Sequence, residues 1–534
     1  MDAGSSTGAS QSAWRPFRHR TFAILWTATV VSNVGGWMYT AASAWLMTML
    51  DADPLLVSLV QVATTLPMFL FALPAGALAD IVDRRRFLIS AELFITVTST
   101  TLAVLVWLEL ITPATLLLLT FLIEAGAAAT APPWQSIVPQ LVPRADLSEA
   151  VALNGVGVNV SRAVGPALGA VLISTIGIGA PFWLNAVSNL GTIGSLWWWR
   201  PPRTRRSQLP PEHFSNALRA GIRHVRHNPS LVATLVRAVG FFMFASCYWA
   251  LLPLVARVQI GGGASVYGAL LASIGASAIA SAIVLPQLRS KLGVNRLVAV
   301  GSIGTAGALC LFAIARDVPT ALAGSLLAGL CWLVVLSSLN VSAQFALPEW
   351  VRGRGLAAYV TISFGGLALG SALWGEIARL IGVPAALLLA AAGQLLAIPL
   401  TWRWKLQSGA DLDLTPSMHW PMPVATANVG IDQGPVLVMV EYRVAQANRA
   451  ALLRALEDLS HERWRDGGYG WTVFEDVVDS NRIVETFYSD SWLEHLRQHE
   501  RVTNADRHLQ EKVAGLLQRP PQIVHLMRLS GGRR

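Results

Sequence analysis

The sequence predicts an all-α polytopic membrane protein, with twelve transmembrane helices in two six-helix halves, followed by a C-terminal α+β soluble domain. Three observations support this class. The 534 residues are 53% hydrophobic and only 13% charged, whereas soluble domains carry about 25% charged residues. Apolar runs of about 20 residues, the length that spans a bilayer, follow one another from residue 22 to residue 403. After residue 434 the composition becomes that of a soluble domain.

The apolar runs are separated by turn signals and define the spans. Backbone groups in lipid must be hydrogen bonded within their own segment, so each run is expected to be a helix. The expected spans are 22–48, 55–79, 87–109, 113–135, 148–175, 180–199, 230–256, 264–286, 296–315, 318–345, 355–381 and 383–403. A weak internal repeat relates the two halves: Gly165-Pro-Ala-Leu-Gly-Ala170 recurs as Gly370-Ser-Ala-Leu-Trp-Gly375. Two related six-helix halves around a midplane site are typical of secondary transporters.

The chain therefore divides into six expected parts. The N-terminal residues are small and polar, without the layout of a signal peptide. The parts are a flexible N-terminal tail (1–13), the first six-helix half (14–199), a cytoplasmic central loop (200–229), the second half (230–404), a linker rich in proline (405–434) and a cytoplasmic soluble domain (435–534).

Lysine and arginine are distributed unequally between the two sides of the membrane. The loops on one side, with the two flanking segments, hold 21 of these residues, and the loops on the other side hold 3. Because basic loops stay in the cytoplasm, we expect both termini to be cytoplasmic in a multi-pass plasma-membrane protein. The basic excess lies in short loops between spans, so it indicates a lipid bilayer as partner and no nucleic acid.

The turn between the second and third spans carries the most specific motif, Gly76-Ala-Leu-Ala-Asp80-Ile-Val-Asp-Arg84-Arg85-Arg86. A basic turn with an embedded aspartate between two membrane helices resembles the signature of the major facilitator superfamily. Ile81 and Asp83 depart from that signature, and Asp83 is interpreted as a subtype mark. The resemblance implies that Gly76, Asp80, Arg84 and Arg85 form a gating motif, with Asp80 against the start of the eleventh span.

The fifth span contains small residues at a spacing that lets helices approach closely. Gly165 and Gly169 flank Pro166, which permits a bend. Together with neighbouring polar residues, this segment resembles the enterobactin-exporter-like branch, also called transmembrane secretion effectors. The resemblance implies a helix-packing motif of exporters, and tight packing alone is the alternative.

Two charged residues are expected near the middle of the membrane, where charges are costly and usually functional. Glu124 lies eleven residues into the fourth span and Arg162 fourteen residues into the fifth. At about 1.5 Å per residue, they reach similar depth on adjacent helices. We expect a pair that binds a proton or an anionic substrate, with a purely structural ion pair as the alternative.

Other polar and aromatic residues within spans are further candidates for the transport pathway. Arg237 either lines the cavity or snorkels to the interface. Asn33, Gln61 and Asn340 either face the cavity or bond a neighbouring helix. Aromatic residues of the first and seventh spans either stack on a large aromatic substrate or anchor the helices at the membrane interface.

The soluble segment alternates strands and helices in the order β-α-β-β-α-β, which is ferredoxin-like. Strands are expected at 436–444, 471–478, 482–488 and 523–529, and helices at 445–464 and 491–517. The stretch 485–499 resembles antibiotic-biosynthesis-monooxygenase-like domains, which implies a homodimer formed through the sheet. His495 and His499 lie one helical turn apart, but no third ligand is evident in the sequence. We therefore expect a solvated or pocket-lining pair and no metal site.

The combined interpretation is a secondary active transporter that works by alternating access. No phosphate-binding Gly-Lys-Ser/Thr loop is present in the sequence, so an ion gradient is the expected energy source. The resemblance implies proton-coupled export of a small amphiphilic molecule of the siderophore, antibiotic or drug-like classes, without enzymatic activity or cofactor. The alternatives are a membrane-anchored enzyme with a catalytic C-terminal domain, and an importer or lipid transporter on the same fold.

The charge bias makes a topology prediction. In a background without the three native cysteines, a cysteine placed at Asp53 or Arg316 should react with an impermeant thiol reagent added to intact cells. A cysteine at Arg205 should react only after the membrane is permeabilised. Labelling in the reverse order would contradict the predicted orientation.

Overall fold

The computed structural model describes residues 14–200, 223, 225–348, 351–407, 417 and 433–528. The expected N-terminal tail, most of the central loop and most of the linker lie outside the described residues. Contacts divide the chain into two compact units. The first comprises Met1–Gln208, Arg237–Leu339 and Val360–Arg403, and the second Leu209–Val236, Asn340–Tyr359 and Trp404–Arg534, each as far as the structure describes them.

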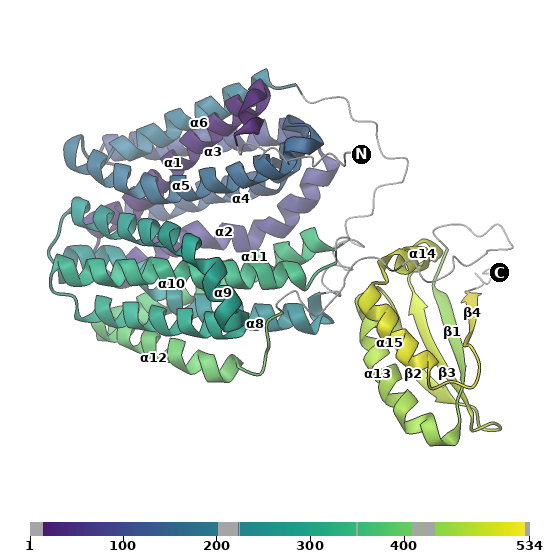
Figure 1. Cartoon of the computed structure of the whole chain (residues 1–534). Helices are drawn as coiled ribbons and strands as arrows, with labels where there is room; N and C mark the ends of the chain where they lie inside the picture. Colours follow the sequence, from purple (N-terminus) through teal and green to yellow (C-terminus); the bar gives the residue numbers. More distant parts are fainter. Residues whose placement is uncertain are drawn as a thin grey trace, which may run out of the picture. The chain divides into compact units, whose positions relative to one another are not determined.

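The membrane part is built from long helices, as predicted (Figure 1). Nine helices in the described ranges are long and apolar enough to cross a membrane by length and composition. The helices are α1 Arg20–Leu50, α2 Pro54–Ile81, α3 Arg84–Trp107, α4 Pro113–Leu141, α5 Leu147–Thr175, α6 Ala180–Trp198, α8 Pro229–Leu254, α9 Ala264–Ile314, α10 Val318–Phe345, α11 Arg352–Ile381 and α12 Val383–Thr401. Short helical turns occupy η1 Arg15–Arg18, η2 Arg144–Asp146 and η3 Val255–Gln259.

Helix α9 contains two of the twelve predicted spans. Its 51 residues are interrupted at Gly293, whose φ of 69° and ψ of 161° are not helical. Glycine adopts a positive φ without the steric penalty that other residues meet. The predicted eighth and ninth spans are therefore two helices that meet at a kink at Gly293, and the twelve-helix arrangement in two halves is confirmed.

Aspartates begin two of the membrane helices. Asp53 accepts hydrogen bonds from the backbone N–H groups of Leu55 (2.8 Å) and Leu56 (3.3 Å) at the start of α2. Asp83 accepts one from the N–H of Arg86 (2.9 Å) at the start of α3. Such caps satisfy donors that have no partner inside the helix. The aspartate that departs from the family signature therefore has a structural role as the N-cap of α3.

Helix α5 packs closely against α1 through its glycines. A Cβ atom at Gly165 would lie 2.5 Å from Trp37 Cβ and 2.9 Å from the Val34 carbonyl oxygen. A Cβ atom at Gly169 would lie 3.2 Å from Met38 Cα. Small residues allow this approach between helix backbones. Both glycines of the predicted packing motif thus face the first helix of their own half.

The same helix contacts the other half through a second set of small residues. Gly268 and Gly275 of α9 lie against Ala170 and Ala163 of α5, and a Cβ atom at Gly275 would be 2.8 Å from Ala163 Cα. Helix α5 is therefore in contact with α1 and with α9 (Figure 1). It joins the core of the first half to the interface between the two halves.

The C-terminal domain has the predicted ferredoxin-like topology (Figure 1). An antiparallel sheet has the strand order β2-β3-β1-β4, and its core lies between the sheet and helices α13 and α15. The elements are β1 Val436–Arg443, η4 Gln446–Asn448, α13 Arg449–Arg465, β2 Tyr469–Glu475, β3 Arg482–Ser489, α14 Trp492–Arg501, α15 Asn504–Ala514 and β4 Gln522–Met527.

The single helix predicted at 491–517 is wrong, because the segment forms two helices. Thr503 begins α15 and forms a capping box with Asp506, in which each side chain accepts a hydrogen bond from the other residue's backbone N–H. This cap provides a second helix start within the run. The break gives α14 and α15 separate directions, which matters for the histidines on α14.

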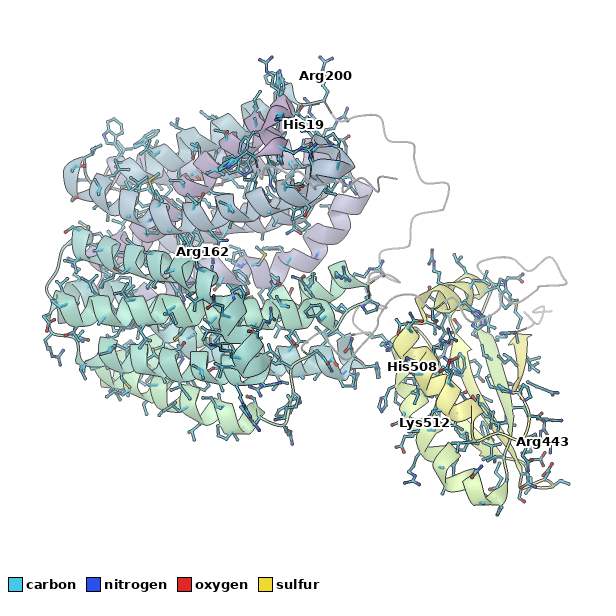
Figure 2. The ribbon with its side chains drawn as sticks, in the orientation of Figure 1. His19, Arg162, Arg200, Arg443, His508 and Lys512 are labelled. Atoms are coloured by element: carbon cyan, nitrogen blue, oxygen red, sulfur yellow. The ribbon has the colours of Figure 1, made fainter. Side chains whose placement is uncertain are left out.

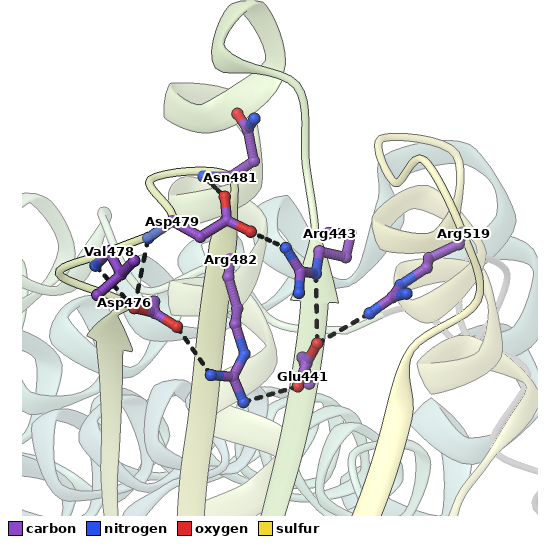
Figure 3. Close-up of polar contacts among 8 residues, drawn as sticks. All are labelled: Glu441, Arg443, Asp476, Val478, Asp479, Asn481, Arg482 and Arg519. Carbon is purple, nitrogen blue, oxygen red and sulfur yellow. Dashed lines mark hydrogen bonds and ion pairs between the residues drawn. The ribbon is translucent and has the colours of Figure 1, made fainter.

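Charged residues link three segments of the domain near one end of the sheet (Figure 3). Glu441 of β1 accepts from Arg443 (3.3 Å), from Arg482 of β3 (2.9 Å) and from Arg519 before β4 (3.0 Å). Asp476 accepts from Arg482, and Asp479 accepts from Arg443. A single exposed ion pair stabilises a protein by only about 0–1 kcal/mol. The main effect of this network is therefore that it holds several segments of the domain to one another.

The close contact of α5 with α1 makes a mutational prediction. Gly165→Ala should lower the thermal unfolding temperature in detergent, because the added methyl group would meet Trp37 and the backbone of Val34. Gly155→Ala is the matched control on the same helix, since nothing lies within 4 Å of its Cβ position. The control should be neutral or stabilising by up to about 1 kcal/mol from helix propensity. Equal melting temperatures for the two variants would contradict this packing.

Candidate functional site

The predicted gating motif lies at the end of α2 and the start of α3. The side chains of Gly76 and Asp80 lie outside the described residues, and Arg84 is the first residue of α3. Arg85 donates from Nε to the Leu196 carbonyl oxygen (2.8 Å) and from Nη2 to that of Trp197 (2.6 Å). These carbonyls belong to the last turn of α6, where a cation is favourable. Arg85 therefore attaches the motif to the end of α6.

Arg162 points toward α1 rather than toward α4. Its guanidinium carbon lies 5.2 Å from the centre of the Trp37 ring, a cation–π geometry. Figure 2 labels Arg162 among the membrane helices. Its Nε atom is buried and has no hydrogen-bond partner among the described residues. Part of this cation is therefore available to another group.

Glu124 also interacts with α1, through a residue that is close to Trp37. Its carboxyl group interacts electrostatically with the buried Tyr39. Trp37 and Tyr39 are two residues apart on α1, about 3 Å along the helix axis. Among the described residues no ion pair joins Glu124 to Arg162. The guanidinium group of Arg162 lies over the Trp37 ring instead.

The remaining pathway candidates are dispersed over several helices. Arg237 is only 4% exposed, lies over the Trp402 ring at 5.3 Å and borders a small pocket with Gln394 of α12. It is thus buried beside the C-terminal end of α12, where Trp402 follows the last helical residue. Asn33 and Gln61 are half-buried on α1 and α2. Asn340 accepts a hydrogen bond from Gln344 one turn along α10 (2.6 Å).

A cluster that the sequence analysis did not identify joins the two halves at the end of the bundle where α1 ends and α9 begins. The rings of Trp45 on α1 and Tyr267 on α9 stack with centres 5.8 Å apart. Arg257 donates to Thr48 Oγ1 (3.2 Å) and lies 6.0 Å from the centre of the Trp45 ring. We call Trp45, Thr48, Arg257 and Tyr267 the inter-half cluster. The feature of the sequence that could have indicated this cluster is Arg257, which is the only charged residue in the segment between α8 and α9.

The aromatic residues of α8 pack inside their own half. Phe241, Tyr248 and Trp249 contact Trp332 of α10, with ring centres between 5.4 and 6.4 Å apart. Phe241 and Tyr248 are each 1% exposed. These side chains form core, in contrast to the substrate-stacking role considered from the sequence.

The C-terminal domain contains a cavity of about 250 Å³ between the sheet and its helices. Its wall is largely apolar, with Val438, Val440 and Phe487 from the sheet. The polar side chains that border it are Tyr442, Arg463, His495, His499, Gln510 and His525. The expectation that the histidine pair lines a pocket is confirmed.

His525 joins the pair of histidines predicted on one helix face. His495 and His499 lie on α14, and His525 lies on β4 opposite Val438 of β1. Val438 is buried on the helix-covered face of the sheet, so His525 points to the same face. The sequence shows no third ligand for this pair, but the structure brings His525 to it. In a strand at 523–529 the side chains alternate between the two faces of the sheet, and this alternation could have indicated the position of His525. It could be used only with the knowledge that β4 pairs with β1.

His495 is almost fully buried, and its environment disfavours the charged ring. Burial, followed by the nearby rings of His525 and His499, lowers the pKa of His495 to about 3. Its Nδ1 lies 3.3 Å from Gln498 Oε1 and its Nε2 lies 3.3 Å from His499 Nε2. The ring is therefore neutral at physiological pH.

A buried ion pair borders the same cavity. Glu485 of β3 is fully buried and accepts hydrogen bonds from Arg463 Nε (3.1 Å), the Tyr442 hydroxyl (2.6 Å) and Trp471 Nε1 (2.9 Å). Burial alone would raise the pKa of Glu485, but Arg463 and these hydrogen bonds outweigh it and hold the pKa below its usual 4.5. The carboxylate is thus ionised and fixes the position of Arg463.

The arrangement of the membrane helices identifies the class of protein. Two six-helix halves in contact through α5 and α9 form the arrangement of a major facilitator superfamily transporter. A solved POT family transporter in complex with a thioalcohol-conjugated peptide aligns over 72% of this chain and 96% of its own length, with a TM-score of 0.60 and 12% identity. A bacterial homologue of the human lysosomal transporter Spinster aligns over 73% and 97%, with a TM-score of 0.56 and 13% identity. At these identities the likeness shows the fold.

The family is shown by the sequence itself. The family model described as transmembrane secretion effector matches residues 11–531, and the chain belongs to that family. The chain is 28% identical over 246 residues to the enterobactin exporter EntS of Salmonella typhimurium, covering 46% of this chain and 58% of EntS. It is 23% identical over 250 residues to macrolide efflux protein A of Streptococcus pyogenes, covering 45% and 60%. The chain thus spans between half and two thirds of the curated relatives that it matches.

The buried ion pair predicts acid sensitivity of the C-terminal domain. A carboxyl group whose pKa is lower in the folded state stabilises the fold at pH values above 4.5, and the contribution is lost as the pH falls through the folded pKa. Glu485→Gln should destabilise the domain at pH 7 by about 3–5 kcal/mol, because Arg463 stays buried without its counter-charge. Proteolysis of the full chain in detergent at graded urea concentrations measures this loss.

The double variant Glu485→Gln, Arg463→Met provides the control for that experiment, since it removes both charges. It should recover much of the lost stability and show a weaker dependence on pH between 5 and 3. Equal stability of Glu485→Gln and the unchanged protein at pH 7 would contradict the role of the pair.

Proposed function

We propose that this protein is a proton-coupled exporter of small amphiphilic molecules of the siderophore or drug-like classes. Its membership of the transmembrane secretion effector family carries this proposal. The names of two relatives, an enterobactin exporter and a macrolide efflux protein, support export and indicate the size and amphiphilic character of the substrate. The transporter fold supports movement by alternating access.

The residues proposed for coupling are Glu124 and Arg162. Arg162 lies over Trp37 of α1 and retains a buried Nε without a hydrogen-bond partner among the described residues. The charge of Glu124 acts on Tyr39 of the same helix. An anionic group of a substrate would supply that partner, because guanidinium groups bind carboxylates and similar anions strongly. Protonation of Glu124 would remove its negative charge from the neighbourhood of the anion. Proton entry at Glu124 and substrate release from Arg162 would then be linked through helix α1, with which both residues interact.

The proposed location is the plasma membrane, with both termini in the cytoplasm. The distribution of basic residues supports this orientation. In that orientation the inter-half cluster lies at the outer end of the bundle, and the motif with Asp80 and Arg85 lies at the inner end. Stacking between Trp45 and Tyr267 would then close the outer side of the pathway in this conformation.

The proposed assembly is a homodimer formed through the C-terminal sheet. The face of the sheet that lacks helices carries Leu437 and Met439 on β1 and Val524 and Leu526 on β4. Val524 and Leu526 are each about half exposed. An exposed apolar strip on an antiparallel sheet favours association with a second copy.

An enzymatic role of the C-terminal domain is the second candidate, and the cavity beside His495 and Arg463 is the observation that favours it. Mass spectrometry of the exported compound separates the two functions. An exporter releases its substrate chemically unchanged, whereas a coupled enzyme releases a modified product.

The coupling proposal is tested by efflux from inverted membrane vesicles loaded with a pH gradient. The probes are enterobactin and the macrolide erythromycin, because the relatives are an enterobactin exporter and a macrolide efflux protein. Glu124→Gln should leave the protein folded but slow gradient-driven uptake into the vesicles at least tenfold and flatten its pH dependence. Arg162→Ala should reduce both the folded yield and the transport rate.

Glu92→Gln on α3 is the matched control, because it removes a carboxyl group from another membrane helix. It should transport at the unchanged rate. If Glu124→Gln keeps the rate and pH dependence of the unchanged protein, Glu124 is structural and the proton site lies elsewhere. Uptake that is independent of the gradient for both probes would contradict proton-coupled export of these classes.

A further inference from the structure

The C-terminal domain brings together three histidines that no feature of the transporter fold requires. His495, His499 and His525 come from α14 and β4, and their ligand atoms all lie within 4.8 Å of one another. The ring centres of His495 and His525 are 4.7 Å apart, and those of His495 and His499 are 4.9 Å apart. Three imidazoles converge on one point at the wall of the cavity.

We propose that His495, His499 and His525 bind one divalent transition-metal ion, such as Zn²⁺, with its fourth coordination position open to the cavity. Three protein nitrogens with a fourth position left to water or a ligand is a common arrangement for zinc that acts on small molecules. Imidazole donors suit zinc, copper, iron and nickel, and disfavour magnesium and calcium.

The spacing of two ligand atoms fits such an ion. The Nε2 atoms of His495 and His499 lie 3.3 Å apart. With Zn–N bonds of about 2.0–2.1 Å at tetrahedral angles, two nitrogen ligands are separated by about 3.3–3.4 Å. The same distance also fits a hydrogen bond between two neutral rings, and the experiment below distinguishes the two.

Groups around the histidines fix the ring that is most deeply buried. Gln498 Oε1 lies 3.3 Å from His495 Nδ1 and accepts a hydrogen bond from its N–H, which leaves the lone pair on Nε2. Metal-bound histidines usually donate their other ring N–H in this way to an oxygen. Trp492 contacts the rings of His495 and His525, with centres 5.6 and 5.8 Å away. The imidazole of His495 is therefore held in the tautomer and orientation that a metal ion needs.

The open side of the proposed site determines what else it would bind. The cavity of about 250 Å³ has an apolar wall. The ion would add one Lewis-acidic position, which binds an atom that carries a lone pair. The fitting ligand is a small, largely apolar molecule with one oxygen or nitrogen donor. The helical break at Thr503 separates α14 from α15, so that α14 carries two of the ligands while α15 contributes Val513 and Gln510 to the cavity wall.

The site is tested on the full-length protein, purified in detergent with a tag that contains no histidine and freed of metal with a chelator. Binding of Co²⁺ and Zn²⁺ is then measured by elemental analysis and, for Co²⁺, by visible absorption. We expect one ion per chain and the intense absorption bands of four-coordinate Co²⁺ with nitrogen ligands. Zn²⁺ should also raise the thermal unfolding temperature of the C-terminal domain, since an ion that binds only the folded state stabilises it.

His525→Ala should abolish this binding at metal concentrations that saturate the unchanged protein. His508→Ala is the matched control, because His508 lies on α15 in the same domain with its side chain 79% exposed (Figure 2). The control should bind one ion with unchanged affinity. Gln498→Leu should weaken binding about 10–100-fold, the usual effect of losing a group that supports a ligand.

Two results would overturn the proposal. The first is a metal-free protein that takes up neither ion, which would assign the 3.3 Å contact to a hydrogen bond. The second is binding that persists in His525→Ala at the affinity of the unchanged protein. If His525→Ala does not fold, the less buried His499→Gln serves as the ligand variant, and retention of binding by a folded His499→Gln protein would equally contradict the site.

Discussion

The close approach of α5 to two other helices is the constraint on which the membrane part depends. Inside a bilayer the hydrophobic effect does not drive helices together, so association rests on van der Waals packing and on interhelical hydrogen bonds. Gly165 and Gly169 bring α5 against the backbone of α1, and Ala163 and Ala170 bring it against glycines of α9. The single helix α5 therefore contacts both the core of the first half and the second half.

This packing also places Arg162, one of the two residues proposed for coupling. Arg162 lies one turn before Gly165, so the contact that brings α5 to α1 also brings the guanidinium group over Trp37. The charge of Glu124 acts on Tyr39, two residues further along α1. Helix α1 continues to Trp45 and Thr48, which contact Tyr267 and Arg257 of the other half. Helix α1 therefore carries residues that interact with the proposed coupling residues and residues of the inter-half cluster.

Much of the fold was predictable because it follows from local rules. Span length, loop charge and the alternation of the C-terminal strands are periodic signals, and they gave the twelve helices and the ferredoxin-like strand order. The contacts that depend on tertiary packing were not predictable. The depth of Glu124 and Arg162 on their helices does not reveal that Arg162 turns toward Trp37. Similarly, His525 lies 26 residues after His499 in the sequence, and only the pairing of β4 with β1 brings it to the other two histidines.

The central claim is that the two halves move relative to each other about the interface that α5 and α9 form. The most direct measurement joins Trp45→Cys to Tyr267→Cys with a short reducible cross-linker, in a chain without native cysteines, and compares substrate efflux before and after reduction. A cross-link between Phe71→Cys and Phe121→Cys, whose rings lie 6.3 Å apart within the first half, is the control. The account predicts that the first cross-link stops efflux, that reduction restores it, and that the control cross-link has little effect. Full efflux with Trp45 and Tyr267 positions joined would contradict it.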